Sequence, residues 1–504
     1  MRNATPLFSP LRLVAPVPNL PVAATPARHL FSSLECWLSS PAALGLPLHA
    51  VERQQEHKDR EVQRLLLEAH IRQRGTGDSG PALRVVTEGS SSIYTHRRVR
   101  RRSLVTIFGP VDIDRTGYSR NGAAAIHPLD AAMQLPARSF SYELQKRLVK
   151  AAVQGPFRES TERLLDHSGL TVHKRSLEQI LPEAALDFDL FYARPLAETS
   201  PATATILVAA VDCKGIPMVR PDRAKHSDGK TGKHQARRHK TGRKKMATVA
   251  AVFTRLPWVR TPQQVVDSLF GTPETTQATE PPPRPENKRI WASLIKSKES
   301  VIDQVAEEVR RRDPQGCKVH VAITDGERAL QNLVGRKLKV ILILDLLHVL
   351  EKVWKAAHVF HPEGSPDAEV YARLMTHRIL EGNVGQVVKG LRQTVTKRKL
   401  FGAKKKALLA VAGYFHNNRQ RMRYHEYLAQ GLPIASGSVE GACKNLIKDR
   451  MERSGMRWTQ AMAESIIRLR ALYLSGHFDA YWDFHIVQDQ LRLHPQGRWT
   501  VVAK

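Results

Sequence analysis

The sequence predicts an α/β protein, a mixed sheet flanked by helices. Short apolar runs at residues 205–211, 318–323 and 339–344 have the length and character of strands buried on both faces. Residues 246–254 form a further strand candidate, and helical patterns at 302–312 and 328–334 alternate with these runs. Three of the runs lead directly to, or within two residues of, an aspartate, which predicts polar chemistry at strand ends.

The composition indicates which kinds of molecule the protein can bind. The 504 residues carry a formal net charge of +30, and 42% of them are hydrophobic, enough for sizeable cores. A charge of this size favours a polyanion, above all nucleic acid, over a merely basic or ribosome-associated protein. The four cysteines form no C-x-x-C pair, which argues against a disulfide scaffold or a cysteine-rich zinc finger. With no apolar stretch of ~20 residues, we expect a cytoplasmic, nucleoid-associated protein without a membrane partner.

The N-terminal third is predicted to contain a leader and a basic module. Residues 1–34 lack acids and are rich in proline, which indicates a disordered leader to about residue 50. Residues 51–74 have the pattern of a solvated helix. Beyond it, two short strands joined at Gly109-Pro110 carry an arginine cluster at residues 97–102. These arginines either contact phosphates or form an ordinary solvated face.

Three helices follow at residues 143–153, 157–167 and 173–181. The short glycine-containing break between the last two has the spacing of a helix-turn-helix motif. Lys174 and Arg175 would then lie near the start of a helix that reads base edges. A purely structural helical hairpin is the alternative.

Three acids are candidates for a metal site. Asp212 and Asp325 each follow a predicted strand, and Glu440 lies where Ser438 could cap a new helix. Hard ions such as Mg²⁺ take oxygen ligands, and two of them can serve both oxygens of a phosphoryl transfer. Each acid taken alone is more simply a loop or capping residue.

The segments around these acids resemble a known family. Val211-Asp-Cys-Lys-Gly-Ile-Pro-Met-Val-Arg-Pro, Asp345-Leu-Leu-His-Val-Leu-Glu-Lys-Val-Trp and Ser436-Gly-Ser-Val-Glu-Gly-Ala-Cys-Lys-Asn are similar to the ISKra-type insertion-sequence DDE transposases. Upstream, Phe108-Gly-Pro-Val, Pro128-Leu-Asp, Gly155-Pro-Phe and Asp187-Phe-Asp-Leu-Phe-Tyr resemble it too, so the resemblance spans roughly residues 95–475. It implies an RNase H-like catalytic core, a helical insertion before the last acid, and a metal-dependent Asp-Asp-Glu triad.

When the motifs of this family are matched to the sequence, the resemblance implies that Asp212 is the first acid and Glu440 the last. Related Mutator-like transposases place the middle acid in a strand-Asp-Gly-helix segment, which matches Asp325 here, and a separate D-x-x-H motif on the next strand. Asp345 and His348 match that second motif, so we assign His348 a supporting role and keep Asp345 as the alternative middle acid. A zinc site at Asp345, His348 and Glu351 would need further ligands, and none is evident.

DNA contacts are predicted on both sides of the core. Eleven Lys or Arg lie between residues 220 and 245, directly after the first acid, where they would bind phosphates. A charge run is otherwise simply solvated. Trp458 could stack on a base, with a core tryptophan as the alternative. The basic residues expected to contact DNA are Lys174, Arg175, Lys214, Lys230, Lys233, Arg237, Arg238, Lys240, Arg243, Lys244, Lys245, Lys444 and Lys448.

Together these features predict a bacterial transposase that cuts DNA and transfers strands at insertion-sequence ends, using two Mg²⁺ or Mn²⁺ ions. Its partners would be terminal inverted repeats and target DNA, bound by a homo-oligomer. The alternatives are a nuclease without joining activity and a DNA-binding regulator derived from a transposase. The expected domains are a leader (1–50), a helix and β-rich module (51–136), a helix-turn-helix-like domain (137–200), a first core part (201–350), a helical insertion (351–432), a last core part (433–475) and a tail (476–504).

Overall fold

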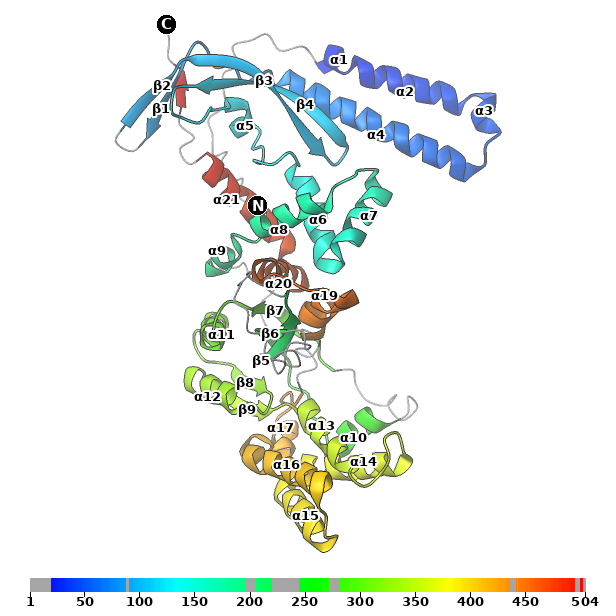
Figure 1. The fold of residues 1–504 in the computed structure, drawn as a ribbon, viewed down its shortest axis with the longest axis vertical. Helices are drawn as coiled ribbons and strands as arrows, with labels where there is room; N and C mark the ends of the chain where they lie inside the picture. The colour runs from blue at the N-terminus through cyan, green and yellow to red at the C-terminus, as the bar shows by residue number, and fades with distance from the viewer. Residues whose placement is uncertain are drawn as a thin grey trace, which may run out of the picture. The chain divides into compact units, whose positions relative to one another are not determined.

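The computed structural model describes residues 20–87, 90–194, 205–219, 244–271, 282–435, 441, 443–494 and 499–501. The chain divides into two compact units (Figure 1). The first comprises Met1–Phe191 together with Asp479–Lys504, and the second comprises Tyr192–Phe478.

The first unit begins with a helical hairpin. The predicted solvated helix is confirmed, but residues 20–44, expected to be disordered, are helical as well. They order because Ala27 and Leu34 are buried as the second helix packs along the fourth, and because Ser40 caps the third by accepting the Ala43 N–H at 3.3 Å. The helices are α1 (Leu20–Ala23), α2 (Thr25–Leu38), α3 (Pro41–Leu44) and α4 (Leu48–Gln73).

A long β-hairpin replaces the two short strands that the sequence predicts. Strands β3 (His96–Thr106) and β4 (Gly109–Ser119) pair antiparallel along their whole length, so the chain turns at residues 107–108 and not at Gly109-Pro110. A second sheet has the order β10-β1-β2, from Trp499–Val501, Leu83–Thr87 and Ser90–Tyr94. The C-terminal strand therefore belongs to the N-terminal unit.

Helices complete the first unit. The three helices of the predicted helix-turn-helix are present, and Gly169, with φ of 62°, ends the second of them. The expected C-terminal tail is instead a helix, whose Tyr481 and Trp482 are fully buried. The helices are α5 (Pro128–Ala132), α6 (Tyr142–Gln154), α7 (Phe157–Ser168), α8 (Lys174–Ala184), α9 (Phe188–Ala193) and α21 (Phe478–Leu493).

The second unit is built on a five-stranded mixed sheet of order β7-β6-β5-β8-β9. Its first three strands pair antiparallel, whereas β8 and β9 run parallel to β5. This arrangement is compatible with an RNase H-like core. The strands are β5 (Ile206–Pro217), β6 (Lys244–Arg255), β7 (Glu286–Ser293), β8 (Val319–Thr324) and β9 (Ile341–Leu344).

Two strands differ from the sequence prediction. Strand β5 does not end at Asp212 but continues to Pro217, because β6 pairs with it over its full length. Strand β7 (Glu286–Ser293) was not among the strands expected from the sequence. Only the last five residues of β7 are buried. The strand begins with three polar, half-exposed residues, so its start does not have the apolar pattern of a buried strand.

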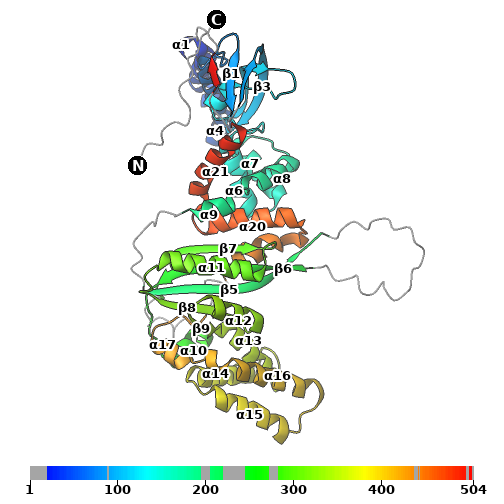
Figure 2. The same cartoon turned by 90° about the vertical axis from the view of Figure 1, so that its left-hand side faces the viewer.

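Helices flank this sheet and extend from it. Helix α11 lies along the sheet against β6 and β5, and α20 packs on β7 (Figure 2). The predicted helical insertion is helical throughout most of its length. No helix in the described ranges is long and apolar enough to cross a membrane. The helices are α10 (Pro262–Phe270), α11 (Lys298–Arg312), α12 (Arg328–Lys337), α13 (Leu346–Ala357), α14 (Pro366–Leu380), α15 (Val384–Lys397), α16 (Gly402–Asn418), η1 (Arg419–Arg421), α17 (Tyr424–Ala429), η2 (Cys443–Lys448), α19 (Asp449–Met451), η3 (Arg453–Gly455) and α20 (Gln460–Leu474).

Candidate active site

Three aspartates lie at one edge of the five-stranded sheet. The parallel register aligns Val211 with Thr324, and Thr324 in turn with Leu344. The residue after each of these is an aspartate: Asp212, Asp325 and Asp345. Since the aligned ends of parallel strands meet at one edge, the sheet topology itself brings the three carboxylates into one neighbourhood.

Asp212 and Asp325 act on each other electrostatically. Burial is the main cause that raises the pKa of Asp325, and the nearby negative charge of Asp212 raises this pKa further. The Glu327 N–H opposes the rise by donating to Asp325 Oδ1 at 3.0 Å, and the Cys213 N–H donates to Asp212 Oδ1 at 2.6 Å. Two half-buried carboxylates that repel each other form a natural cation site.

Asp345 has a different local role from these two acids. It is 3% exposed and caps α13, accepting the Leu347 N–H on Oδ1 at 3.0 Å. Its own N–H donates to the Thr324 carbonyl at 3.0 Å, which ties the start of α13 to β8. Capping accounts for Asp345 without a metal, whereas the pKa of Asp325 stays raised although the Glu327 N–H donates to its carboxylate.

Positive groups border the acids. His348 lowers the pKa of Asp325 through its charge, so it lies near that carboxylate, and its Nδ1 is 3.5 Å from Glu351 Oε2. Lys298, at the start of α11, holds Glu327 with contacts of 2.5 and 2.8 Å. That hydrogen bond is the main cause that raises the pKa of Lys298, and Asp325 contributes as well. The sequence analysis did not single out Lys298.

The helical insertion reaches the site through Tyr414, which the sequence analysis also missed. A Cβ on Gly326 would lie 2.2 Å from Tyr414 Cε2, so only glycine fits beneath the ring. Burial, followed by the charges of Asp325 and Asp345, raises the pKa of Tyr414. The Asp-Gly pair was the only sequence signal for this close approach.

Further contacts fasten the insertion to the same edge. Gln331, which is 1% exposed, donates to the Asp325 carbonyl at 2.9 Å and to Asn418 Oδ1 at 3.1 Å. The Tyr424 hydroxyl donates to the Leu344 carbonyl at 2.8 Å. The insertion therefore contributes to the architecture of the acidic edge.

Glu440, the third predicted acid, lies outside the described residues. Within the described part of the chain, no group of three His, Cys, Asp or Glu side chains is gathered closely enough to hold a metal ion. Asp212 and Asp325 offer carboxylate oxygens, the donor type that Mg²⁺ and Mn²⁺ prefer. The two described acids therefore fit a hard divalent cation.

The predicted DNA contacts divide into described and undescribed residues. Lys214 is half-buried on β5. Lys244 makes an ion pair with Glu452 at 2.7 Å, and the Lys245 ammonium donates to Gln460 at 2.8 Å. These pairings link the start of β6 to the segment around residues 452–460. The remaining basic candidates of this run lie outside the described residues: Lys230, Lys233, Arg237, Arg238, Lys240 and Arg243.

The other DNA candidates are mostly exposed. Lys174 pairs with Glu178 at 3.3 Å, and Arg175, Lys444 and Lys448 are exposed. Lys444 and Lys448 both lie within the π-helix η2.

Trp458 requires a correction, because it is 5% exposed and its indole N–H donates to the Met451 carbonyl at 2.9 Å. A buried, hydrogen-bonded indole belongs to the core, and no base can stack on it. The Arg450 guanidinium, itself fully buried, covers the ring at 4.9 Å. The core alternative is thus the one that the structure supports.

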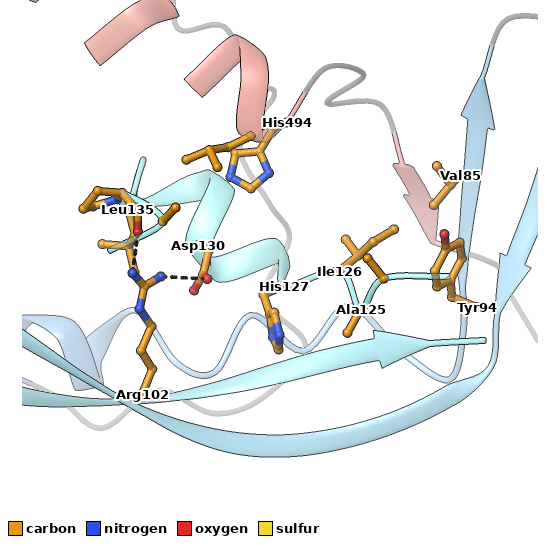
Figure 3. Close-up of a pocket in the computed structure, with 13 residues that line it drawn as sticks. Val85, Tyr94, Arg102, Ala125, Ile126, His127, Asp130, Leu135 and His494 are labelled. Carbon is orange, nitrogen blue, oxygen red and sulfur yellow. Dashed lines mark hydrogen bonds and ion pairs between the residues drawn. The ribbon is translucent and has the colours of Figure 1, made fainter. Parts of the chain in front are cut away.

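The first unit contains a cavity of about 370 Å³ beside a buried charge cluster (Figure 3). Arg102 reaches Asp130 at 3.1 Å and the Arg138 carbonyl at 2.8 Å, while Arg115 pairs with the same Asp130 oxygen. This cluster ties α5 to the β3–β4 hairpin. Within the predicted basic patch, Arg102 is therefore structural, whereas Arg98 and Arg100 remain exposed.

Comparisons with known proteins add one structural neighbour. No protein-family model matches the chain, and a search of curated proteins finds no match. Among solved structures, a chain of the Drosophila P element transposase strand transfer complex matches at 9% identity. The match covers 68% of this chain and 80% of that chain, with a TM-score of 0.24.

Proposed function

We propose that this protein is a DDE transposase of the ISKra type, which cleaves DNA at the ends of an insertion sequence and transfers the freed strand to target DNA. Asp212, Asp325 and Glu440 are the proposed catalytic and metal-binding residues. The observation that carries the proposal is the parallel register of β5 and β8, which brings Asp212 level with Asp325, the residue that follows β8. A basic chain of net charge +30 would bind the DNA.

The carboxylates fit the chemistry that this reaction requires. Divalent ions held by them would activate the attacking oxygen and stabilise the leaving oxygen. Burial of Asp325, together with the neighbouring Asp212, makes the empty pair unfavourable and therefore raises its affinity for a cation. Lys298 and His348, which border the acids, are placed to contact the phosphate groups of a bound strand.

The decisive experiment measures Mg²⁺-dependent cleavage and strand transfer on DNA that carries the element's ends. Asp212→Asn and Asp325→Asn should each reduce both activities by at least ~10³-fold, because each removes a charged ligand from the reacting centre. DNA binding should remain nearly unchanged in both variants. Full cleavage by either variant would refute the assignment of that residue.

Asp345→Asn serves as the matched comparison for the middle acid. An amide can still cap α13, so we expect this variant to retain structure and most activity. If Asp345→Asn is inactive and Asp325→Asn is active, the middle ligand is Asp345.

The two alternative functions give different outcomes in the same assay. A nuclease would nick DNA but would not join a pre-cut 3′-OH end to target DNA. A DNA-binding regulator would bind the ends and would not nick them at any Mg²⁺ or Mn²⁺ concentration.

A further inference from the structure

Two arginines flank the loop that joins β6 to α10 in the second unit. Arg255 is the last residue of β6 and lies opposite Ile206 in the sheet. Arg260 directly precedes Thr261, which caps α10 through a capping box with Gln264. Neither arginine stood out in the sequence, where both lie beyond the long basic run.

The loop between them is held in a fixed position. The Trp258 N–H donates to the Gly431 carbonyl at 2.9 Å, and the Arg260 N–H donates to the Leu428 carbonyl at 3.4 Å. Gly431 has φ of +69°, and a Cβ there would lie 2.6 Å from Trp258 N. Only glycine allows this close approach, so the loop and the end of α17 are fitted to each other.

The two guanidinium groups are partly desolvated and lack acidic partners. Arg255 Nη2 and Arg260 Nε are both buried without a hydrogen-bond partner. Arg260 stacks over Trp258 at 4.2 Å, and Arg255 Nε donates only to the Leu256 carbonyl at 3.4 Å. No carboxylate in the described ranges forms an ion pair with either arginine.

This environment is electrostatically unfavourable in the free protein. Burial lowers the pKa of Arg255, and burial together with the charge of Arg255 lowers the pKa of Arg260 to about 10. Two cations that repel each other in a partly dry setting cost stability unless an anion lies between them.

We infer that Arg255 and Arg260 form a phosphate-binding site for the DNA backbone, separate from the acidic edge. The guanidinium fork matches phosphate oxygens, and the positive end of α10, a helix of 9 residues, starts directly after Arg260. This inference rests on the proposed function, because it takes DNA as the source of the phosphate.

The register of the sheet gives the distance between Arg255 and the level of Asp212. Asp212 pairs with Val249 and Ile206 with Arg255, so six residues of β6 separate Arg255 from the level of Asp212. At ~3.4 Å per residue this is roughly 20 Å, or about six base pairs of duplex at ~3.4 Å each. The arginines would hold flanking DNA and not the phosphate that is cut.

The test measures the salt dependence of duplex binding by the full-length protein. Each phosphate contact contributes about 0.9 to the slope of log K against log salt, so Arg255→Gln/Arg260→Gln should reduce the slope by about 2. The charge-retaining Arg255→Lys/Arg260→Lys variant should keep most of the wild-type slope. An unchanged slope in the Gln variant would overturn the inference.

The control replaces two other arginines of the same unit, Arg310→Gln/Arg423→Gln. Both are exposed and paired with acids, at 2.8 Å to Glu307 and 3.0 Å to Glu426. We expect this control to change the slope by less than half as much as the test pair. An equal loss in both would mean that the slope reports only total charge, which would also overturn the inference.

Sulfate provides a second readout that requires neither DNA nor activity. At constant ionic strength, sulfate should raise the Tm of the wild-type protein more than that of Arg255→Gln/Arg260→Gln, because an anion relieves the repulsion only when both arginines are present. Equal shifts would contradict an anion site.

Wild-type cleavage separates this inference from the proposed function. If the wild type nicks DNA with Mg²⁺ and the slope does not depend on the arginines, the phosphate site is wrong and the transposase proposal stands. If the slope depends on the arginines and no nicking occurs, the phosphate site stands and the proposed function fails.

Discussion

Asp187 in the first unit and Asp325 in the second show what surroundings do to the same side chain. Asp187 is 4% exposed, its Oδ2 lies 2.7 Å from His485 Nδ1, and its Oδ1 accepts from Arg492 at 2.6 Å. Burial would raise the pKa of Asp187, but hydrogen bonds from His485 and Arg492 outweigh it and lower the pKa. Burial raises the pKa of Asp325, and Asp212 adds to the rise.

This difference in surroundings separates a structural acid, Asp187, from an acid of the candidate site, Asp325. The carboxylate of Asp187 is matched by positive partners from α21 and needs no ligand. At the acidic edge Asp212 lies near enough to raise the pKa of Asp325, and two like charges there cost stability unless a cation is bound. Asp187 lies in one of the segments that carry the family resemblance and Asp325 matches a pattern of a related group, so sequence similarity alone does not distinguish the two acids. Their electrostatic surroundings do.

The largest expected effect is the loss of the matched pair at Asp187. Asp187→Asn should lower the free energy of unfolding by about 3–5 kcal/mol, because it leaves Arg492 and His485 without their buried counter-charge. The lowered pKa means that this stabilisation is present above the unfolded pKa of about 3.9 and is lost as the pH falls through the folded value. Denaturant unfolding at pH 7 and at pH 3 measures both. A deficit that does not shrink in acid would contradict the ion pair.

A second structural acid should give a smaller loss. Asp130→Asn weakens the contacts to Arg102 and Arg115 that hold α5 to the hairpin, so we expect a loss of about 2–3 kcal/mol. Thermal unfolding would measure it. Asp112→Asn is the matched control, since Asp112 is exposed and 3.9 Å from its arginine. Equal losses in both would mean that burial of the cluster contributes nothing.

At the acidic edge we expect the opposite sign, so that replacing an acid increases the free energy of unfolding. Asp325→Asn should raise the free energy of unfolding at pH 7 by about 1 kcal/mol, because it removes one of two repelling carboxylates. The raised pKa of Asp325 means that its protonated form stabilises the fold below the unfolded pKa, and that this benefit is lost as the pH rises through the folded value. The gain should therefore disappear in acid.

Mg²⁺ sharpens the same comparison, because a bound ligand stabilises only the folded state. Millimolar Mg²⁺ should raise the Tm of the wild type above its value in metal-free buffer and should have little effect on the Tm of Asp325→Asn. Destabilisation by Asp325→Asn at pH 7 would place this residue with Asp187 among the structural acids.

The smallest expected effect concerns the phenol that covers Gly326. Tyr414→Phe removes the phenol oxygen that lies against Gly326, which should lower the free energy of unfolding by about 0.5–1.5 kcal/mol. Gly326→Ala should cost more, since its Cβ would overlap the ring. The double variant Gly326→Ala/Tyr414→Ala should recover part of that loss, and thermal unfolding measures all three. Additive losses would contradict a direct contact.

Much of the fold could be predicted from local patterns. The apolar runs that become β5, β6, β8 and β9 were recognisable because each is buried on both faces and short. Strand β7 was missed because its first three residues are polar and half-exposed and follow a proline-rich segment. The helices at residues 20–44 were missed because the prolines and the lack of acids in residues 1–34 indicated disorder, whereas packing on α4 orders α2.

The candidate site was only partly predictable. Asp212 and Asp325 could be chosen because each follows a strand candidate, and residue order alone suggested that a sheet would align them. For Trp458 the sequence left base stacking and a core position open, because local sequence does not report burial, and the structure supports the core position. Tyr414 lies 88 positions beyond Gly326 and carries no local signal, so its contact emerges only when the inserted helices fold back onto the sheet.

The sequence by itself determined the charge, the strand-forming runs and the acids that end them, because these are local properties of neighbouring residues. Only the tertiary structure decided which charges are matched. The pairing of Asp187 with α21 and the effect of Asp212 on Asp325 depend on contacts between distant segments, as does the loop that carries Arg260, which bonds to Leu428 and Gly431. Electrostatic energy depends on distance and burial, and neither quantity exists before the chain has folded.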